Sequence, residues 1–404
     1  MRQTIAATLL AAASLVGTAC SDGTDADLLI RNVTVIDAVG GDQGPRDVGI
    51  RGARIAYVDA AGRAKRRAAA EVIDGSGRFL IPGLWDMHVH LTWPPDWRDP
   101  MLRLFTANGI TSVRDTGGEL GAVVAARQAA RTADFAAPDV YISGPLLDGA
   151  AIVYDGSAPG YPPLGISLKT PLQARVAVAT LDGARVDFVK AYEMLAPDVF
   201  AAVLAAAAER GLPVSAHVPL SVDAAAARAN DLQHLRNVEL ACAEDHERLL
   251  AERRREWLEL SADLEERTSR PDFMAWSRRT VQRYREFGGT LLAGTDTPLA
   301  FLTPGASLHR ELRELVAAGL TPREALAAAT SNAAGWFGRD GETGRIAPGL
   351  AADMVLLRAD PLADIGNTET IDAVVRGGVC LDTDTLAAYR DAARERIDPA
   401  ADSQ

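Results

Sequence analysis

The chain has 404 residues, of which 48% are hydrophobic and 24% are charged. This is the composition of a folded globular protein, and the length suits two or three domains or one barrel with an appendage. The formal net charge is -12, from 42 Lys and Arg against 54 Asp and Glu, which makes nucleic acid a poor partner. Cys20, Cys242 and Cys380 lie far apart, so neither a cysteine zinc cluster nor a disulfide scaffold is expected.

The N-terminus has the layout of a secretory signal peptide. Arg2 precedes an apolar run rich in Ala and Leu that ends in small residues before Cys20, and the run is too short to span a membrane stably. The small residues and Cys20 resemble the bacterial lipoprotein processing site, with Gly17 where a branched residue is usual. We therefore interpret residues 1–20 as a signal peptide and expect export to the periplasm or cell envelope. The protein is then either attached to the membrane through lipidated Cys20 or released by simple cleavage.

Short β-like stretches occur near both ends of the chain. They alternate apolar and polar residues and are punctuated by Gly and Asp, as strands of a small sheet are. They cover residues 28–36, 47–58, 70–81, 343–357 and 371–381. Two half-sets of strands that flank a long middle predict a small β-sandwich domain built from residues 26–81 and 341–390, with a C-terminal tail at 391–404.

Between residues 82 and 340, short apolar strands alternate with Ala-rich helical segments. Strands are expected at 84–91, 110–115, 140–143, 186–191, 213–218, 231–235 and 290–295, and helices at 197–210, 271–287 and 306–318. Repeated β-then-α units favour a parallel sheet with helices outside, either a (β/α)8 barrel or an open doubly wound sheet. The seventh strand of a barrel has one weak candidate, Glu239–Ala243, within a charged helical stretch.

The first of these strands ends in Asp86-Met87-His88-Val89-His90. Side chains alternate along a strand, so His88 and His90 point to the same side. Two imidazoles one strand-step apart can bind a metal ion, although an isolated His-x-His is more often a pair of core histidines.

Three further residues of ligand type end other strands. His217 closes an apolar run, His234 lies at the end of the strand candidate that begins at Asp231, and Asp296 follows the last apolar run. The carboxyl ends of barrel strands are where active sites assemble. Four histidines and one aspartate at four strand ends therefore predict a site suited to zinc; manganese, cobalt or iron would bind similarly.

Lys190 ends the apolar strand that begins at Val186. A lysine in such a strand usually snorkels to solvent or pairs with an acid. Beside dications, however, the neutral amine is favoured and can add CO₂ to become a carbamate. A carbamate is anionic and bidentate, so it can bridge two metal ions about 3.5–4 Å apart. We therefore predict a carboxylated Lys190.

Residues Pro82 to Leu91 closely resemble the opening motif of the amidohydrolase superfamily. Lys190, His217, His234 and Asp296 match the remaining ligands of that family in order and strand context, and Gly344 to Val355 resembles its C-terminal return to the small domain. The resemblance covers about residues 28–380 and is closest to the imidazolonepropionase and Xaa-Pro dipeptidase-like branch. It implies the (β/α)8 TIM-like barrel and not the open doubly wound sheet.

The resemblance also implies a role for each ligand. His88, His90 and Asp296 would hold one metal ion, and His217 and His234 a second. Carboxylated Lys190 and a hydroxide would bridge the two ions, which lower the pKa of that water to near neutrality. Asp296 would act as general base and pass the proton to the leaving group, while Asp86 would support the site without binding metal.

A second group of residues is assigned from position alone. Arg114 and Asp115 end the second strand, where either would face substrate or take part in a buried ion pair; Arg114 is the candidate substrate contact of the two. Tyr192, next to the Lys190 strand, and Tyr154, in the Gly- and Pro-rich loop 149–163, are candidate substrate contacts. His309 and His246 are expected to be structural and solvated, respectively.

Three functions remain open. The first is a two-metal hydrolase of the amide bond of a dipeptide or N-acyl amino acid. The second is a one-metal deaminase on the same fold, which commonly carries a Glu three residues after the fifth-strand His; here that position is Leu220. The third is a non-catalytic envelope lipoprotein that keeps the barrel as a binding module. The loss of a metal ligand would be its signature, and no ligand is missing from the sequence. Residues 142–149 lack the His that the Xaa-Pro dipeptidase branch often has there, which argues against proline dipeptides.

Overall fold

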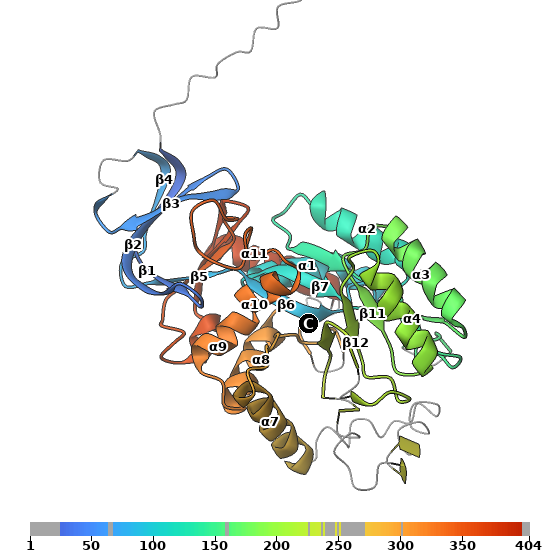
Figure 1. Ribbon diagram of the computed structural model, residues 1–404. Helices are drawn as coiled ribbons and strands as arrows, with labels where there is room; N and C mark the ends of the chain where they lie inside the picture. The colour runs from blue at the N-terminus through green and yellow to red at the C-terminus, as the bar shows by residue number, and fades with distance from the viewer. Residues whose placement is uncertain are drawn as a thin grey trace, which may run out of the picture.

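A computed structural model describes residues 25–63, 68–157, 161–224, 227–235, 237–238, 247–248, 250–251, 271–299 and 302–397 (Figure 1). The predicted signal peptide with Cys20, the strand candidate Glu239–Ala243 and His246 lie outside these residues. Export and lipidation therefore stay predictions. Over the described ranges, no helix has both the length and the apolar character needed to cross a membrane.

Parallel strands form the wall of the barrel. They are β6 (Leu84–Val89), β7 (Ile110–Asp115), β8 (Asp139–Ile142), β9 (Leu146–Asp148), β11 (Val189–Ala191), β12 (Val214–Ala216) and β13 (Asp231–Leu232), with β10 (Gly165–Ser167) beside β9. The ladders run in the orders β6-β7-β8 and β10-β9-β11-β12-β13. A bond from Asp187 N to Ile142 O, 2.9 Å long, connects the two ladders next to β11. Strands buried on both faces explain the nearly continuous apolar runs in the sequence.

The last predicted strand, residues 290–295, is not a regular strand in the structure. It nevertheless lies along β6, because Met87 N donates to Ala293 O over 2.9 Å and Asp296 N donates to His88 O over 2.8 Å. These bonds bring the end of the barrel sequence back to its first strand.

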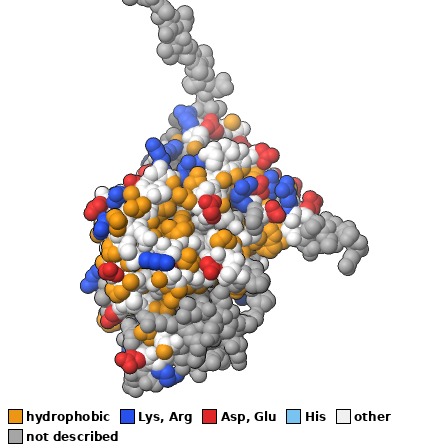
Figure 2. All heavy atoms as spheres, turned by 90° about the vertical axis from the view of Figure 1, so that its right-hand side faces the viewer, with side chains coloured by type: hydrophobic (Ala, Val, Ile, Leu, Met, Phe, Trp, Pro, Cys, Tyr) orange, Lys and Arg blue, Asp and Glu red, His pale blue; other side chains and the backbone are white. Residues whose placement is uncertain are grey.

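Helices cover the outside of the barrel (Figure 1). They are α1 (Arg98–Ala107), α2 (Leu120–Arg131), α3 (Pro171–Gly183), α4 (Pro197–Ala208), α7 (Pro271–Glu286), α8 (Ala306–Ala317), α9 (Pro322–Ala328) and α10 (Ser331–Trp336), with short 3-10 turns η2 (Pro95–Trp97) and η5 (Ile365–Glu369). The starts of α3 and α9 are encoded locally: Thr170 and Thr321 each form a capping box, followed by a Pro in the first turn. Figure 2 views the side where α3 and α4 lie and shows apolar side chains interspersed with charged ones, as on ordinary protein surfaces.

Strands from both chain ends join in one eight-stranded sheet. Its members are β1 (Ala26–Asp37), β2 (Gly41–Arg51), β3 (Arg54–Ala60), β4 (Ala69–Asp74), β5 (Phe79–Pro82), β14 (Met354–Leu357), β15 (Ile371–Arg376) and β16 (Val379–Asp382). β5 is the link, since it pairs with β1 on one side and β14 on the other and then continues through Gly83 into β6. A Cβ at Gly83 would collide with the Thr111 side chain, so the glycine allows the sheet to approach the barrel closely.

The chain after the small sheet is helical. Helix α11 (Thr383–Ile397) packs on α1, and Tyr389 Oη accepts a bond from Ala136 N over 3.0 Å. The predicted tail, 391–404, therefore begins inside a helix that belongs to the folded body.

Arg376 ties the small sheet to the barrel. Its guanidinium contacts both carboxylate oxygens of Asp353 at 3.0 and 3.1 Å, donates to Ala137 O at 2.8 Å and reaches Asp139 at 2.7 Å. The Arg376 and Asp353 side chains are only 15% and 5% exposed. A buried, fully bonded pair of this kind is costly to break because the remaining charge is left without a partner.

We expect Arg376→Ala to lower the free energy of unfolding by about 3 kcal/mol. The measurement is urea unfolding followed by circular dichroism. Arg358→Ala is the matched control, because Arg358 is 57% exposed and lies 3.9 Å from its partner Asp372; it should change stability by less than about 0.5 kcal/mol. Equal losses in the two variants would contradict this role of Arg376.

Candidate metal centre

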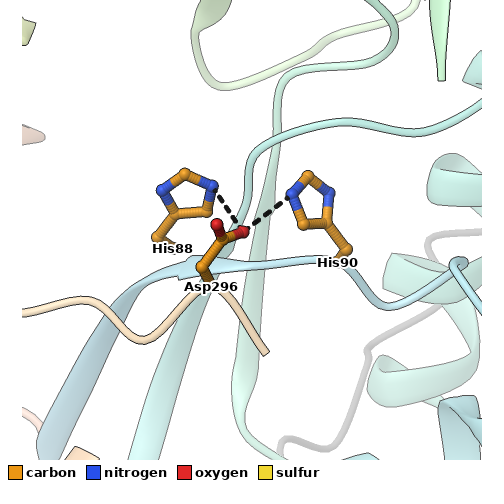
Figure 3. Close-up of side chains that lie close together, drawn as sticks. All are labelled: His88, His90 and Asp296. Carbon is orange, nitrogen blue, oxygen red and sulfur yellow. Dashed lines mark ion pairs between the residues drawn. The ribbon is translucent and has the colours of Figure 1, made fainter. Parts of the chain in front are cut away.

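His88 and His90 lie at the carboxyl end of β6 and meet Asp296 (Figure 3). Asp296 Oδ1 is 3.2 Å from His88 Nε2 and 3.3 Å from His90 Nε2. One ligand atom from each of the three residues lies within 4.8 Å of the others. Burial holds the pKa of His88 well below its usual value, which keeps its ring neutral, as a metal ligand must be. These three residues therefore form a preassembled group of metal-ligand type.

His217 and His234 extend this group. Their ring centroids are 4.9 Å apart, and that of His234 is 4.8 Å from His88. His234 Nε2 lies 3.7 Å from Asp296 Oδ2. The second carboxylate oxygen thus faces His234, which itself lies beside His217, so Asp296 contacts both halves of the site.

Two of the histidines are oriented by groups behind them. His217 Nδ1 is 2.8 Å from Glu193 Oε1, and His90 Nδ1 is 2.9 Å from Gly117 O. Because a carbonyl oxygen can only accept, His90 Nδ1 is the donor in its pair. The opposite nitrogen, Nε2, is then left with its lone pair for a ligand.

Lys190 lies on β11 with its side chain 1% exposed. Its Nζ donates to Gln233 Oε1. Burial lowers the pKa of Lys190 to about 7, against the opposing effect of Asp231. The amine is therefore substantially neutral at physiological pH, which is the form that reacts with CO₂.

The charged residues below the site, Arg114 and Asp115, are bonded to other side chains or to backbone groups. The Arg114 guanidinium contacts Asp231 at 3.2 and 3.1 Å and donates to Met87 O at 2.6 Å. Asp115 accepts from Leu91 N and Gly117 N. Of the two roles considered from the sequence, the buried ion pair is the one that the structure shows for Arg114, with Asp231 as the partner; its role as a substrate contact stays a prediction.

Asp86 supports the ligand segments from beneath. Its carboxylate accepts from Thr295 N and Thr295 Oγ1, at 3.0 and 2.7 Å, and from His88 N at 3.2 Å. Burial raises the pKa of Asp86 to about 7. The ring nitrogens of His309 face Thr368 Oγ1 and Asn108 O, which fits the structural role expected for it.

A pocket of about 290 Å³, part of it open to solvent, has these ligand-type residues in its lining. The described lining comprises His88, His90, Lys190, His217, His234, Asp296, Trp93, Tyr154, Tyr192, Leu146 and Leu299. Tyr154 and Tyr192 were assigned to the site from sequence. Trp93, Leu146, Leu299, Glu193 and Gln233 were not.

Two of the missed residues left a signal in the sequence. Gln233 directly precedes His234, and Glu193 comes three residues after Lys190, so both could have been flagged as neighbours of ligands. Trp93 left no such signal, because its place depends on the loop after β6.

Comparison with known proteins relates the chain to amidohydrolases. A family model described as the amidohydrolase family matches residues 281–381. Adenine deaminase 2 of Agrobacterium fabrum is 29% identical over 341 residues, which cover 82% of this chain and 53% of that protein. The chain spans about half the length of the curated relatives of this kind.

Solved structures show the same fold. Ochratoxinase of A. niger matches with a TM-score of 0.70 and 22% identity, covering 88% of this chain and 95% of its own. A prolidase complexed with N-methylphosphonate-L-proline matches with a TM-score of 0.69 and 21% identity, covering 88% and 99%. The predicted barrel fold is confirmed, and the family-model match together with the adenine deaminase relatives supports the predicted resemblance to the amidohydrolase superfamily.

Proposed function

We propose that this protein is a metal-dependent hydrolase that cleaves the amide C–N bond of a dipeptide or an N-acyl amino acid. The observation that carries the proposal is the convergence of four histidines, Asp296 and Lys190 on one pocket. The family relatives support hydrolytic C–N cleavage in general.

The donor set suits divalent metal ions. His88, His90 and Asp296 would hold one ion, and His217 and His234 a second, with Lys190 as its carbamate between them. Neutral imidazole nitrogens and a carboxylate are the ligands that zinc prefers. Glu193 and Gly117, behind two of the rings, are the outer partners that such ligands require.

Bound in this pocket, the ions would supply a water activated at neutral pH and polarise the substrate carbonyl. The chain's own part in the reaction is proton transfer and positioning. Asp296 lies between both groups of histidines and lines the pocket, so it accepts the proton of the attacking water and returns it to the leaving nitrogen. Tyr192, which also lines the pocket, lies beside His217 with ring centroids 4.4 Å apart.

Deamination is the second candidate, favoured by the similarity to adenine deaminases over 82% of this chain. Two observations count against it. Leu220, where a deaminase of this fold commonly has its Glu, packs in an apolar cluster with Leu146, Val153, Leu164 and Tyr192. Lys190 is buried in the pocket lining, as expected for a bridged two-metal site.

The direct test is metal content and a substrate panel. Protein purified without chelators should contain close to two metal ions per chain by elemental analysis and should hydrolyse members of a dipeptide and N-acyl amino acid panel. Release of ammonia from adenine at a higher kcat/KM than any amide, together with one ion per chain, would favour the deaminase instead. No bound metal after reconstitution with zinc and bicarbonate would contradict both.

Lys190→Ala should lower the metal content together with the activity, because the bridge between the two ions is lost. In the parent protein, ¹³C NMR after exchange with labelled bicarbonate should show a carbamate signal that the variant lacks. Lys169→Ala, at an exposed lysine, is the matched control and should keep both the metal and the signal. Two ions per chain in Lys190→Ala would rule out the bridging role.

Asp296→Asn should keep the far-ultraviolet circular dichroism of the parent and lower kcat by about 10²–10⁴-fold, the usual contribution of a positioned acid–base group. Asp134→Asn, at a side chain that is 93% exposed, should leave kcat within twofold. Near-parent turnover by Asp296→Asn would show that another group transfers the proton.

A further inference from the structure

Three aromatic rings connect the two histidine groups along the pocket. The ring centroids of Trp93 and Tyr154 are 5.6 Å apart, and those of Tyr154 and Tyr192 are 6.0 Å apart. The row starts at His90, 5.9 Å from Trp93, and ends at His217, 4.4 Å from Tyr192. We call Trp93, Tyr154 and Tyr192 the aromatic arc. All three line the same pocket as the proposed metal ligands.

The arc is held in place by backbone bonds and packing. Tyr192 N donates to Leu147 O over 2.9 Å, and Tyr154 O accepts from Leu164 N and Gly165 N. The buried Asp148 carboxylate accepts from Val153 N and Met194 N, at 2.9 and 2.8 Å. This carboxylate joins the segment before Tyr154 to the segment after Tyr192, so the two rings are positioned by the same group.

The remaining lining of the pocket carries no charge. Once the six proposed ligands are set aside, the lining residues that the structure describes are the arc, Leu146 and Leu299. A carboxylate or ammonium group of a substrate would find no partner of opposite charge among these described residues, and burying an unpaired charge is costly. An aromatic ring, in contrast, gains edge-to-face contacts with the arc beyond the gain from burial alone.

We propose that the arc binds an aromatic ring on the acyl side of the scissile amide, so that the substrate is an aromatic N-acyl amino acid. This inference rests on the proposed function. An N-acyl amino acid has its carboxylate on the amine side, so its uncharged acyl group suits the arc. A dipeptide carries its ammonium group on the acyl side, so its acyl part does not suit the uncharged arc.

The test compares N-benzoylglycine with N-acetylglycine, which share the same leaving group. The metal-loaded parent protein should hydrolyse N-benzoylglycine with a kcat/KM at least about tenfold higher. Tyr154→Leu and Trp93→Leu should each reduce that ratio severalfold, while Tyr154→Phe, which keeps the ring, should preserve it. Tyr284→Leu, at a tyrosine on α7 that is 52% exposed, is the matched control and should also preserve it.

The outcomes separate this inference from the proposed function. Equal kcat/KM values for the two substrates would overturn the role of the arc and leave the amide hydrolase intact. A preference for N-acetyl-L-phenylalanine over N-benzoylglycine would place the ring on the amine side and overturn the assignment. If the metal-loaded protein hydrolyses none of these substrates, the proposed function fails. Equilibrium dialysis then tests whether the arc binds an aromatic ring: equal binding of N-benzoylglycine and N-acetylglycine would overturn that role.

Discussion

The Asp296 carboxylate faces both halves of the candidate site, and the geometry of the site depends on where it is held. One oxygen lies 3.2 and 3.3 Å from the histidines of β6, and the other lies 3.7 Å from His234. The residue adopts a left-handed backbone, with φ of 62°, which costs a non-glycine residue of order 1 kcal/mol. The bond from its own N–H to His88 O, together with the bonds of the adjacent Thr295 to Asp86, offsets that cost.

The ligand group of His88, His90 and Asp296 forms where the segment that bears Asp296 pairs with β6. The segment that bears Asp296 contributes no regular strand, yet its backbone pairs with β6. The first and last parts of the barrel sequence, more than two hundred residues apart, must therefore meet before the three-residue ligand group exists. Because this ligand group requires the two segments to be paired, metal affinity reports on that pairing.

Charge and aromatic surface are separated within the barrel. Arg114 and Asp231 neutralise each other below the pocket, and the carboxylates of Asp86 and Asp115 are bonded to backbone N–H groups. None of these four residues belongs to the pocket lining that the structure describes. Inside the pocket, the ligand-type side chains face a solvent-accessible space that is otherwise bounded by aromatic rings and leucines. The polar chemistry thus has one location, and the part of the remaining pocket surface that the structure describes is uncharged.

The sequence by itself determined the order of the elements and the residues of ligand type. Local alternation and apolar runs, which short-range sterics and burial control, predict the places of these residues along the chain: His88, His90, Lys190, His217 and His234 in or next to strands, and Asp296 after an apolar run. Helix starts such as Thr170 and Thr321 are also encoded locally. Only the tertiary structure decided that Arg114 pairs with Asp231, that Gln233 meets Lys190, and that three aromatic residues from separate loops form one arc. Those contacts join residues far apart in the chain, and loop conformation and packing across the barrel, which leave no periodic trace in a sequence, select them.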